Sequence, residues 1–250
     1  MHRFYLPPEQ CRGERFMLIG GEAHHALHVL RLRRGEDVVV LDGTGGEYRA
    51  EVQNIKRDTV ELSVIEKKQH ASAPCRVTLL QAVPKGKLFE TIIQKATELG
   101  AARVVPLLTE RVVLDLDNKA AEKKTAKWQA VAIEAIKQCG SVWLPEVFPP
   151  VRITEVLARK EMIDLPLVAC LEPDSKHPRE YFDSFRRQQG RNPASVCIWI
   201  GPEGDFTPDE YAAIKAGGSL PITLGSLVLR TDTAAVYCLS ILNYELSAGV

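Results

Sequence analysis

Short apolar runs that alternate with polar residues fill the first part of the chain. The runs at 37–42, 47–53 and 59–64 are typical of half-buried β-strands, and glycine-rich or charged turns separate them. One helical pattern, at 21–31, interrupts the series. The turn between the first two runs predicts a hairpin. The pattern therefore indicates a small β-rich domain over residues 1–72.

From residue 73 onward, strand-like runs alternate with longer helical patterns. Apolar runs at 77–82, 104–108, 165–171 and 194–200 predict strands. In the helical segment before Gly100, the apolar residues share one face: Leu88, Phe89, Ile92, Ile93, Ala96 and Leu99. A second long helix is expected around 128–138. This alternation predicts an α/β domain over residues 73–250, with a mostly parallel sheet and helices on both faces.

Glycines directly follow an apolar run at two places near the C-terminus. Gly201-Pro202-Glu203-Gly204 comes after the run at 194–200, and Gly225 comes after Ile222-Thr223-Leu224. In α/β sheets, ligands bind outside the strand ends, where bare backbone can approach them closely. The first junction alone is equally compatible with an ordinary strand-to-helix turn. The two together predict adjacent loops around one small-molecule pocket.

Both junctions lead into helical patterns. Thr207 occupies a predicted N-cap, Pro208 the first helical position, and Glu210 stands three residues after the cap. After the second junction, a short apolar hook at 227–229 leads to Arg230, Thr231 and Asp232. A final helix is expected over 233–246. Charged and polar groups therefore stand at the entrance of this last helix.

The composition is that of a soluble two-domain protein. The chain has 250 residues, of which 45% are apolar and 26% charged. No apolar run reaches membrane-spanning length, and the first ten residues lack the apolar stretch of a signal peptide. The six cysteines are scattered and form no C-x-x-C pair, which is typical of reduced thiols. We therefore expect a cytoplasmic protein that does not contact membranes.

Several motifs, in a constant order, resemble a known family. GPEG before a capped helix is followed by LG-x-LVLRTDTA, and an H-x-x-x-V-L-R segment lies at 25–31. The block IIQKATELGAARVVPLLTER occupies 92–111, and QCG followed by LPE occupies 138–146. Together with the opening His-Arg-Phe-Tyr, these segments resemble the RsmE family of 16S rRNA uridine-N3 methyltransferases, in the SPOUT superfamily. The resemblance covers nearly the whole chain.

Three positions depart from the family pattern. Ser141 stands where an arginine commonly follows QCG, and Asp205 stands where many members have a third glycine. Asp232 replaces the usual glutamate, which keeps the carboxylate but shortens its reach. The glycines of the two junctions, Gly201, Gly204 and Gly225, are all present.

The resemblance implies a fold and an activity. It implies a C-terminal SPOUT-type α/β domain with a deep trefoil knot over 73–250, preceded by a PUA-like β-barrel RNA-binding domain over 1–72. Knots are rare in proteins, so the knot rests on the resemblance alone. The implied reaction is methylation of N3 of a single uridine in 16S rRNA by S-adenosylmethionine. The resemblance also implies a homodimer with the site near the interface.

The resemblance further implies site residues, carried over position by position. The cofactor contacts offer apolar walls and backbone groups: Leu171, Glu172, Ile200, Gly201, Pro202, Glu203, Gly204, Leu224, Gly225, Leu227, Val228, Leu229 and Arg230. The implied RNA contacts are Arg3, His25, Arg31, Lys95 and Arg111.

The chemistry of methyl transfer to uridine N3 assigns roles to two of these positions, Arg230 and Glu203, and to Asp232. The nitrogen carries a weakly acidic proton, so the enzyme must favour the deprotonated ring and hold it in line with the methyl group. Arg230 is the candidate to orient the ring and stabilise its negative charge, because arginine stays protonated. Glu203 or Asp232 could accept the proton, or either could order a loop. Alternatively, Arg230 forms an ion pair with Asp232 near the helix start.

The charge balance limits how RNA can be held. The chain has 32 basic and 32 acidic side chains, whereas proteins that bind nucleic acid by bulk attraction are usually basic. The arginines at 31, 33 and 34 are equally compatible with RNA contact and with a solvated face. The lysines at 119, 123, 124 and 127 are interpreted as a solvated helix face. A neutral enzyme would depend on a few placed contacts and on the shape of its substrate, which an assembled 30S subunit offers better than naked RNA.

Other functions remain open on the sequence. His24 and His28 stand four residues apart, a spacing that can bind zinc, but nothing nearby completes a site and no metal is expected. A SPOUT methyltransferase acting on tRNA or on a ribose 2′-hydroxyl is one alternative. A non-catalytic ribosome-assembly factor that keeps the fold is another.

Overall fold

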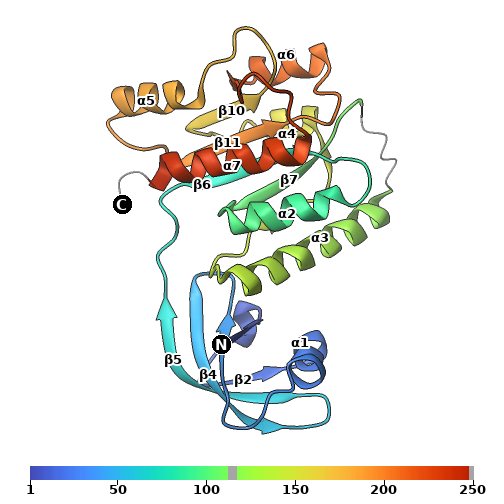
Figure 1. Cartoon of the computed structure of the whole chain (residues 1–250), viewed down its shortest axis with the longest axis vertical. Coiled ribbons are helices and arrows are strands. Elements are labelled where there is room, and N and C mark those ends of the chain that lie inside the picture. The colour runs from blue at the N-terminus through green and yellow to red at the C-terminus, as the bar shows by residue number, and fades with distance from the viewer. Residues whose placement is uncertain (112–116, 248–250) are drawn as a thin grey trace. The chain divides into compact units, whose positions relative to one another are not determined.

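The computed structural model describes residues 1–111 and 117–247, which separate into two units (Figure 1). The first unit consists of Met1–Ser72 together with Ile133–Leu144, and the second of Ala73–Ala132 with Pro145–Val250. The long helix α3 (Asn118–Cys139) therefore contributes its first half to one unit and its last turns to the other. None of the helices in the described part of the chain is long and apolar enough to cross a bilayer.

The N-terminal unit is built on a five-stranded sheet. Its strands are β1 (His2–Tyr5), β2 (Arg15–Leu18), β3 (Asp37–Leu41), β4 (Gly46–Ile55) and β5 (Val60–Gln69), in the order β1-β3-β4-β5-β2. β1 runs parallel to β3, and the other neighbours are antiparallel. The hairpin predicted between β3 and β4 is confirmed. β1 and β2 were not predicted, because four residues are too few to establish a period.

One core unites these strands. Alternate residues of β4 are buried, and every strand contributes to the same cluster, for example through Phe4, Phe16, Val38 and Leu62. Helix α1 (Gly20–His24) covers the cluster with Ala23 and continues as the π-helical turn η2 (His25–Val29). The helix predicted at 21–31 therefore exists, although its second half is π-helical, a form often found at functional sites.

The end of α3 and the turn after it are fastened to this unit. The ammonium of Lys137, 8% exposed, lies 2.8 Å from both Glu22 of α1 and Glu134. Gly45 donates its N–H to the Val142 carbonyl at 3.0 Å. A Cβ atom on Gly45 would lie 2.6 Å from the ring of Trp143, and the residue has φ +96°, so glycine is required there.

The second unit contains a parallel sheet. Its strands are β6 (Arg76–Ala82), β7 (Arg103–Leu108), β8 (Glu146–Val147), β9 (Val151–Arg152), β10 (Leu165–Ala169), β11 (Ser195–Ile200) and β12 (Leu220–Ile222). The order is β12-β10-β11-β6-β7-β8, with β9 also pairing with β7. All of these pairings are parallel, which confirms the predicted sheet type.

Helices cover both faces of this sheet, as predicted. The helices are α2 (Leu88–Glu98), α4 (Ile153–Ala158), α5 (Pro178–Gln189), α6 (Pro208–Ala216) and α7 (Thr231–Ser247). On one face, α7 packs against α2, β6 and β11 (Figure 1). On the other, Leu80 and Trp199 pack with Ile153 of α4 and Ile214 of α6. The central strands β6, β10 and β11 therefore bury both of their faces.

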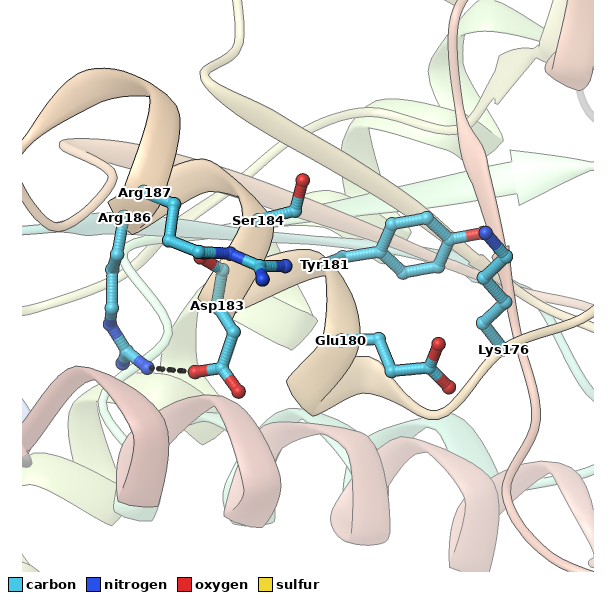
Figure 2. Close-up of a pocket in the computed structure, with 7 residues that line it drawn as sticks. All are labelled: Lys176, Glu180, Tyr181, Asp183, Ser184, Arg186 and Arg187. Carbon is cyan, nitrogen blue, oxygen red and sulfur yellow. Dashed lines mark hydrogen bonds and ion pairs between the residues drawn. The ribbon is translucent and has the colours of Figure 1, made fainter.

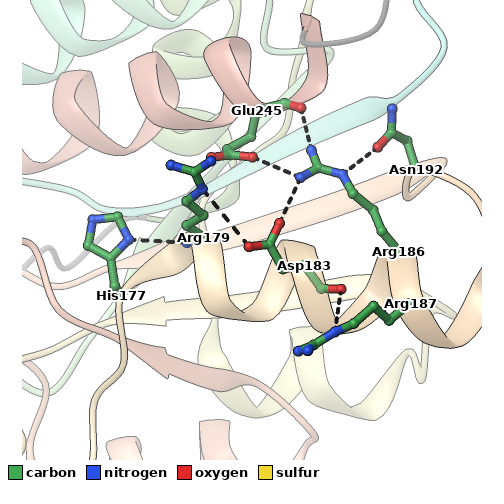
Figure 3. Close-up of polar contacts among 7 residues, drawn as sticks. All are labelled: His177, Arg179, Asp183, Arg186, Arg187, Asn192 and Glu245. Carbon is green, nitrogen blue, oxygen red and sulfur yellow. Dashed lines mark hydrogen bonds and ion pairs between the residues drawn. The ribbon is translucent and has the colours of Figure 1, made fainter.

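An arginine of α5 holds the C-terminal end of α7 (Figure 3). Arg186 donates one hydrogen bond to the Glu245 carboxylate at 3.0 Å and another to its carbonyl at 2.7 Å. The same guanidinium contacts Asp183 and Asn192. The last turn of a helix has unpaired carbonyls and a partial negative charge, so a guanidinium stabilises it.

Candidate active site

The carboxyl ends of the parallel strands meet at one edge of the sheet, and a cavity of about 250 Å³ opens there. The loops after β10 and β11, the segment after β12 and the start of α7 line it. The structure brings together most residues implied as cofactor contacts: Leu171, Ile200, Gly201, Pro202, Glu203, Gly204, Leu224, Gly225, Leu227, Val228 and Leu229. Glu172 and Arg230 do not line it. Asp205 lines it, as expected for a charged residue at the rim, whereas Ala169, Cys170, Thr231 and Ala234 line it without having been predicted.

The loop after β11 is held at both ends. Thr207 accepts a hydrogen bond from the Glu210 N–H at 3.3 Å, and the Glu210 carboxylate accepts one from the Thr207 N–H at 2.9 Å. The predicted N-cap of α6 is therefore confirmed. At the other end, a Cβ atom on Gly201 would lie 2.8 Å from the Asp205 carboxylate, so a larger residue there would displace that side chain.

The loop after β7 braces this glycine loop. Glu210 is 9% exposed, and its second carboxylate oxygen accepts a hydrogen bond from the Glu110 N–H at 2.8 Å. Arg111 donates to the carbonyl of Gly204 and, at 3.3 Å, to that of Asp205. Arg111, implied as an RNA contact, thus also positions the backbone of the candidate pocket.

Asp205 has an unusual backbone and an unusual environment. Its φ is +62°, in the left-handed region where glycine is most at ease and aspartate is better tolerated than most residues. Burial raises the pKa of its carboxyl, against the lowering effects of the hydrogen bond from the Phe206 N–H and of Arg111. The departure from glycine at this position therefore places a partly desolvated acid in the pocket wall.

A buried hydroxyl connects three elements behind the cavity. Thr231, the first residue of α7, donates to the Gly201 carbonyl at 2.7 Å and accepts from the Gln81 amide at 2.9 Å. Gln81 stands near the end of β6 and is fully buried. α7 begins at Thr231, two residues before the predicted start, so Thr231 and Asp232 belong to its first turn.

Cys170 lines the cavity with an unreactive thiol. Its sulfur lies 3.3 Å from the hydroxyl oxygen of Tyr211. Burial raises the pKa of the Cys170 thiol despite the opposing effect of this hydrogen bond, so the thiol stays protonated near neutral pH. The residue therefore shapes the pocket rather than acting as a nucleophile.

The candidate catalytic side chains differ in exposure. Glu203 and Arg230 are exposed, Glu203 on the glycine loop and Arg230 just before α7. Asp232 is half-buried, and its Oδ1 has no hydrogen-bond partner among the described residues. Within the described residues, Arg230 and Asp232 form no ion pair. A carboxylate in the first turn of a helix is stabilised by the helix dipole.

The implied RNA contacts are divided between the two units. In the N-terminal unit, Arg3 donates to the carbonyls of Lys137 and Gln138, at 3.4 and 3.2 Å, and so caps the C-terminal end of α3. His25 and Arg3 line a cavity of about 270 Å³, and Arg31 is exposed with φ +54°. In the C-terminal unit, Lys95 pairs with Glu98 at 2.8 Å.

A further cavity, of about 580 Å³, lies along α5 (Figure 2). Charged and polar side chains such as Lys176, Glu180 and Arg187 line it, and it shares no residue with the cavity at the strand ends. Small-molecule sites have predominantly apolar walls with a few placed polar groups. The cavity at the strand ends fits that description better.

Comparison with known proteins defines the class. The family model "RNA methyltransferase domain" matches residues 71–243, and the model "RNA methyltransferase PUA domain" matches residues 18–65. Fold and site together are therefore those of an RNA methyltransferase with an N-terminal PUA domain.

The ribosomal RNA small subunit methyltransferase E of Synechocystis is 35% identical over 97% of this chain and 77% of its own length. That of Bacillus subtilis is 32% identical over 92% of this chain and 90% of its own. The chain belongs to the ribosomal RNA small subunit methyltransferase E family, as the resemblance predicted.

Solved structures agree with this assignment. A methyltransferase from Legionella pneumophila, solved with bound S-adenosylmethionine, superposes with a TM-score of 0.86 at 32% identity, covering 97% of this chain and 96% of that one. The ribosomal RNA small subunit methyltransferase E of Neisseria gonorrhoeae, also bound to S-adenosylmethionine, gives 0.85 at 26% identity, covering 98% and 97%.

Proposed function

We propose that this protein transfers a methyl group from S-adenosylmethionine to N3 of a single uridine in 16S rRNA, on the assembled 30S subunit. The observation that carries the proposal is the cavity at the strand ends, which is lined by the glycine loops and by Leu229 and Thr231, the residues on either side of Arg230. Family membership and the two cofactor-bound relatives support the cofactor and the substrate class.

The residues of the cavity fit the cofactor. Leu171, Leu227 and Val228 line it with large apolar side chains that are 61%, 74% and 76% exposed. An adenine ring would cover such surface, and the bare backbone of Gly201 and Gly225 can approach the polar parts of a ligand. When bound, S-adenosylmethionine supplies an activated methyl group.

The remaining steps fall to the protein. Arg230 stands just before α7, where its exposed guanidinium can stabilise the negative charge of the deprotonated uracil ring. Glu203 lines the cavity and is exposed, so it can accept the N3 proton and release it to water. Asp232, half-buried in the first turn of α7 and with its Oδ1 unpaired among the described residues, is the alternative acceptor for this proton.

The finer architectural features are also proposals. The chain leaves edge strand β12 and returns over β11 and β6 as α7, where Thr231 bonds to the loop after β11. This path supports a deep trefoil knot. On α7, Tyr237, Ile241 and Tyr244 have the spacing of one helix face, and the two tyrosines are 44% and 73% exposed. That face supports a homodimer, in the cytoplasm where ribosomal subunits are present.

The test uses purified protein, labelled S-adenosylmethionine, and either 30S subunits or naked 16S rRNA from a strain that lacks this gene. Mapping of modified nucleosides by mass spectrometry should find 3-methyluridine at one position, in subunits only. Methylation of tRNA or of a ribose hydroxyl would replace the proposal with that activity. Absence of cofactor binding would favour a non-catalytic assembly factor.

Arg230→Ala tests the mechanism within the same assay. We expect a loss of about 10²–10³-fold in methylation rate with little change in cofactor affinity, because the guanidinium acts on the developing charge. Arg179→Ala, which removes an exposed arginine from α5, is the matched control. Full activity of Arg230→Ala would refute its role.

A further inference from the structure

A second groove of the C-terminal unit adjoins the candidate cofactor cavity. It has a volume of about 850 Å³, is lined by the loop after β6 and by α3, and shares Glu203 with the cavity. Six cationic side chains line it: Lys85, Lys87, Arg111, Lys123, Lys124 and Lys127. Only two carboxylates, of Glu90 and Glu203, accompany them. In a chain with equal numbers of acidic and basic residues, this is a marked local excess of positive charge.

The fold assembles this charge from two distant segments. Lys85 and Lys87 flank Gly86, whose φ of +74° turns the loop, and both side chains are exposed. Lys123 and Lys127 stand four residues apart and share a face of α3. The sequence interpretation of the α3 lysines as a solvated face considered that helix alone. In the structure they line one groove with the loop lysines.

Much of this charge is not neutralised by the protein. Lys127 pairs with Glu90, and the Lys124 ammonium lies 5.9 Å from the centre of the Trp128 ring. Lys85, Lys87 and Lys123 form no ion pair with any residue in the described part of the chain. Grouped ammonium groups repel one another, so such a groove favours a polyanion.

The two aromatic residues of the groove limit which part of a nucleic acid can bind there. Phe89 and Trp128 line it but are only 2% and 4% exposed, and they pack against each other with ring centres 4.5 Å apart. Neither ring can stack on an unpaired base. Lysine ammonium groups contact phosphates without reading sequence.

We propose that this groove binds the phosphodiester backbone of the RNA next to the target nucleotide and leads it past Arg111 and Glu203 to the cavity. The inference rests on the proposed function and adds the route by which the substrate enters. Arg111 lies where the groove meets the cavity: it lines the groove and donates to the Gly204 and Asp205 carbonyls at the rim of the cavity. The lysines supply affinity and register, while recognition of the uridine is left to the cavity.

The test replaces the three lysines that form no ion pair with a described residue, as K85Q/K87Q/K123Q. Binding to transcribed 16S rRNA is measured at several salt concentrations, with methylation of 30S subunits and cofactor binding in parallel. We expect RNA affinity to fall about tenfold or more and the slope of log affinity against log salt to fall by about 2, since each single-strand phosphate contact contributes about 0.7. Cofactor affinity should stay unchanged, and the loss in methylation should appear in KM.

The matched control is K176Q/R179Q/R187Q, which removes three exposed cations from the region of α5. It should bind RNA as the unsubstituted protein does. Equal losses in both triple variants, or an unchanged salt slope in the first, would overturn the inference. If the protein binds rRNA through the groove but methylates nothing, the proposed function fails while the groove stands. If the unsubstituted protein methylates 30S subunits and K85Q/K87Q/K123Q has the same RNA affinity and the same KM, the groove inference fails and the proposed function stands.

Discussion

At the scale of single residues, Asp205 both strains and stabilises the loop after β11. Its backbone adopts the left-handed conformation, and its carboxylate accepts a hydrogen bond from the Phe206 N–H at 2.8 Å. Many family members are expected to have glycine there, which accepts this conformation freely. The loop therefore keeps its shape at a conformational cost that the side-chain hydrogen bond partly offsets.

Asp205→Ala should be less stable than Asp205→Gly by about 1–2 kcal/mol. Both variants lose the carboxylate, but alanine still carries a Cβ in the left-handed region. Urea denaturation at neutral pH measures the difference. Equal stability of the two variants would show that the φ of +62° imposes no strain.

Asp205→Asn should reveal the raised pKa of the carboxyl. Because burial raises this pKa above the ordinary value of 3.8, the folded protein holds the proton more tightly than the unfolded chain. Stability from this group is therefore fully present below pH 3.8 and is lost as pH rises through the folded pKa. The stability of Asp205→Asn relative to the unsubstituted protein should thus increase between pH 3.5 and 7, measured by urea denaturation. A difference independent of pH would contradict the shift.

Thr231→Val should destabilise the protein by about 1–3 kcal/mol and weaken cofactor binding. The substitution leaves the Gly201 carbonyl and the Gln81 amide without their shared partner in a buried place. Thr233→Val, at an exposed position of the same helix, is the control and should be nearly neutral. Denaturation and calorimetric titration measure the two effects, and Thr231→Ser should restore most of both.

At the scale of elements, the ends of helices carry much of the organisation. α6 begins with a capping box formed by residues three apart. By contrast, Arg186 of α5 donates to a carbonyl in the last turn of α7, and Arg3 of β1 donates to one in the last turn of α3. Orphan carbonyls at a helix end need a donor, and a distant arginine serves as well as a local one. The caps thus tie separate elements together as well as ending helices.

Arg186→Ala should destabilise the protein by about 2 kcal/mol. It removes the hydrogen bond to the Glu245 carbonyl and leaves the carboxylate of Glu245, a residue that is 7% exposed, without this partner. Arg187→Ala, at the exposed neighbouring position, should change stability by less than about 0.5 kcal/mol. Thermal denaturation compares the two, and equal effects would show that the contact to α7 adds nothing.

At the scale of the whole molecule, the N-terminal unit is discontinuous in sequence. Residues 133–144 contribute Lys137, which pairs with Glu22, and a turn whose Leu144 N–H donates to the Gly43 carbonyl at 2.9 Å. Without that segment, Glu22 and the β3–β4 turn would lose these partners. A fragment cut at the apparent boundary near residue 72 would therefore lack part of its own structure.

A fragment of residues 1–72 should be clearly less stable than the same fragment joined by a flexible linker to residues 133–144. The added segment restores the Lys137 ion pair and the packing of Trp143 on Gly45. Urea denaturation followed by circular dichroism measures both transitions. Coincident midpoints would show that the unit folds without the segment. In a further control, Lys137→Met in the joined fragment should lose part of the gain.

The sequence by itself determined the features whose signals are local. The strand runs, the β3–β4 hairpin, the face of α2, the cap at Thr207 and the two glycine loops all follow from residues a few positions apart, and the ordered motifs identified the family. Only the tertiary structure decided that Thr231 meets Gln81, that Arg3 caps α3, and that Lys85 and Lys123 line one groove. These partners are tens of residues or more apart in the chain. No periodicity or spacing encodes such a pairing, because it depends on how the sheet orders its strands and on where each strand ends.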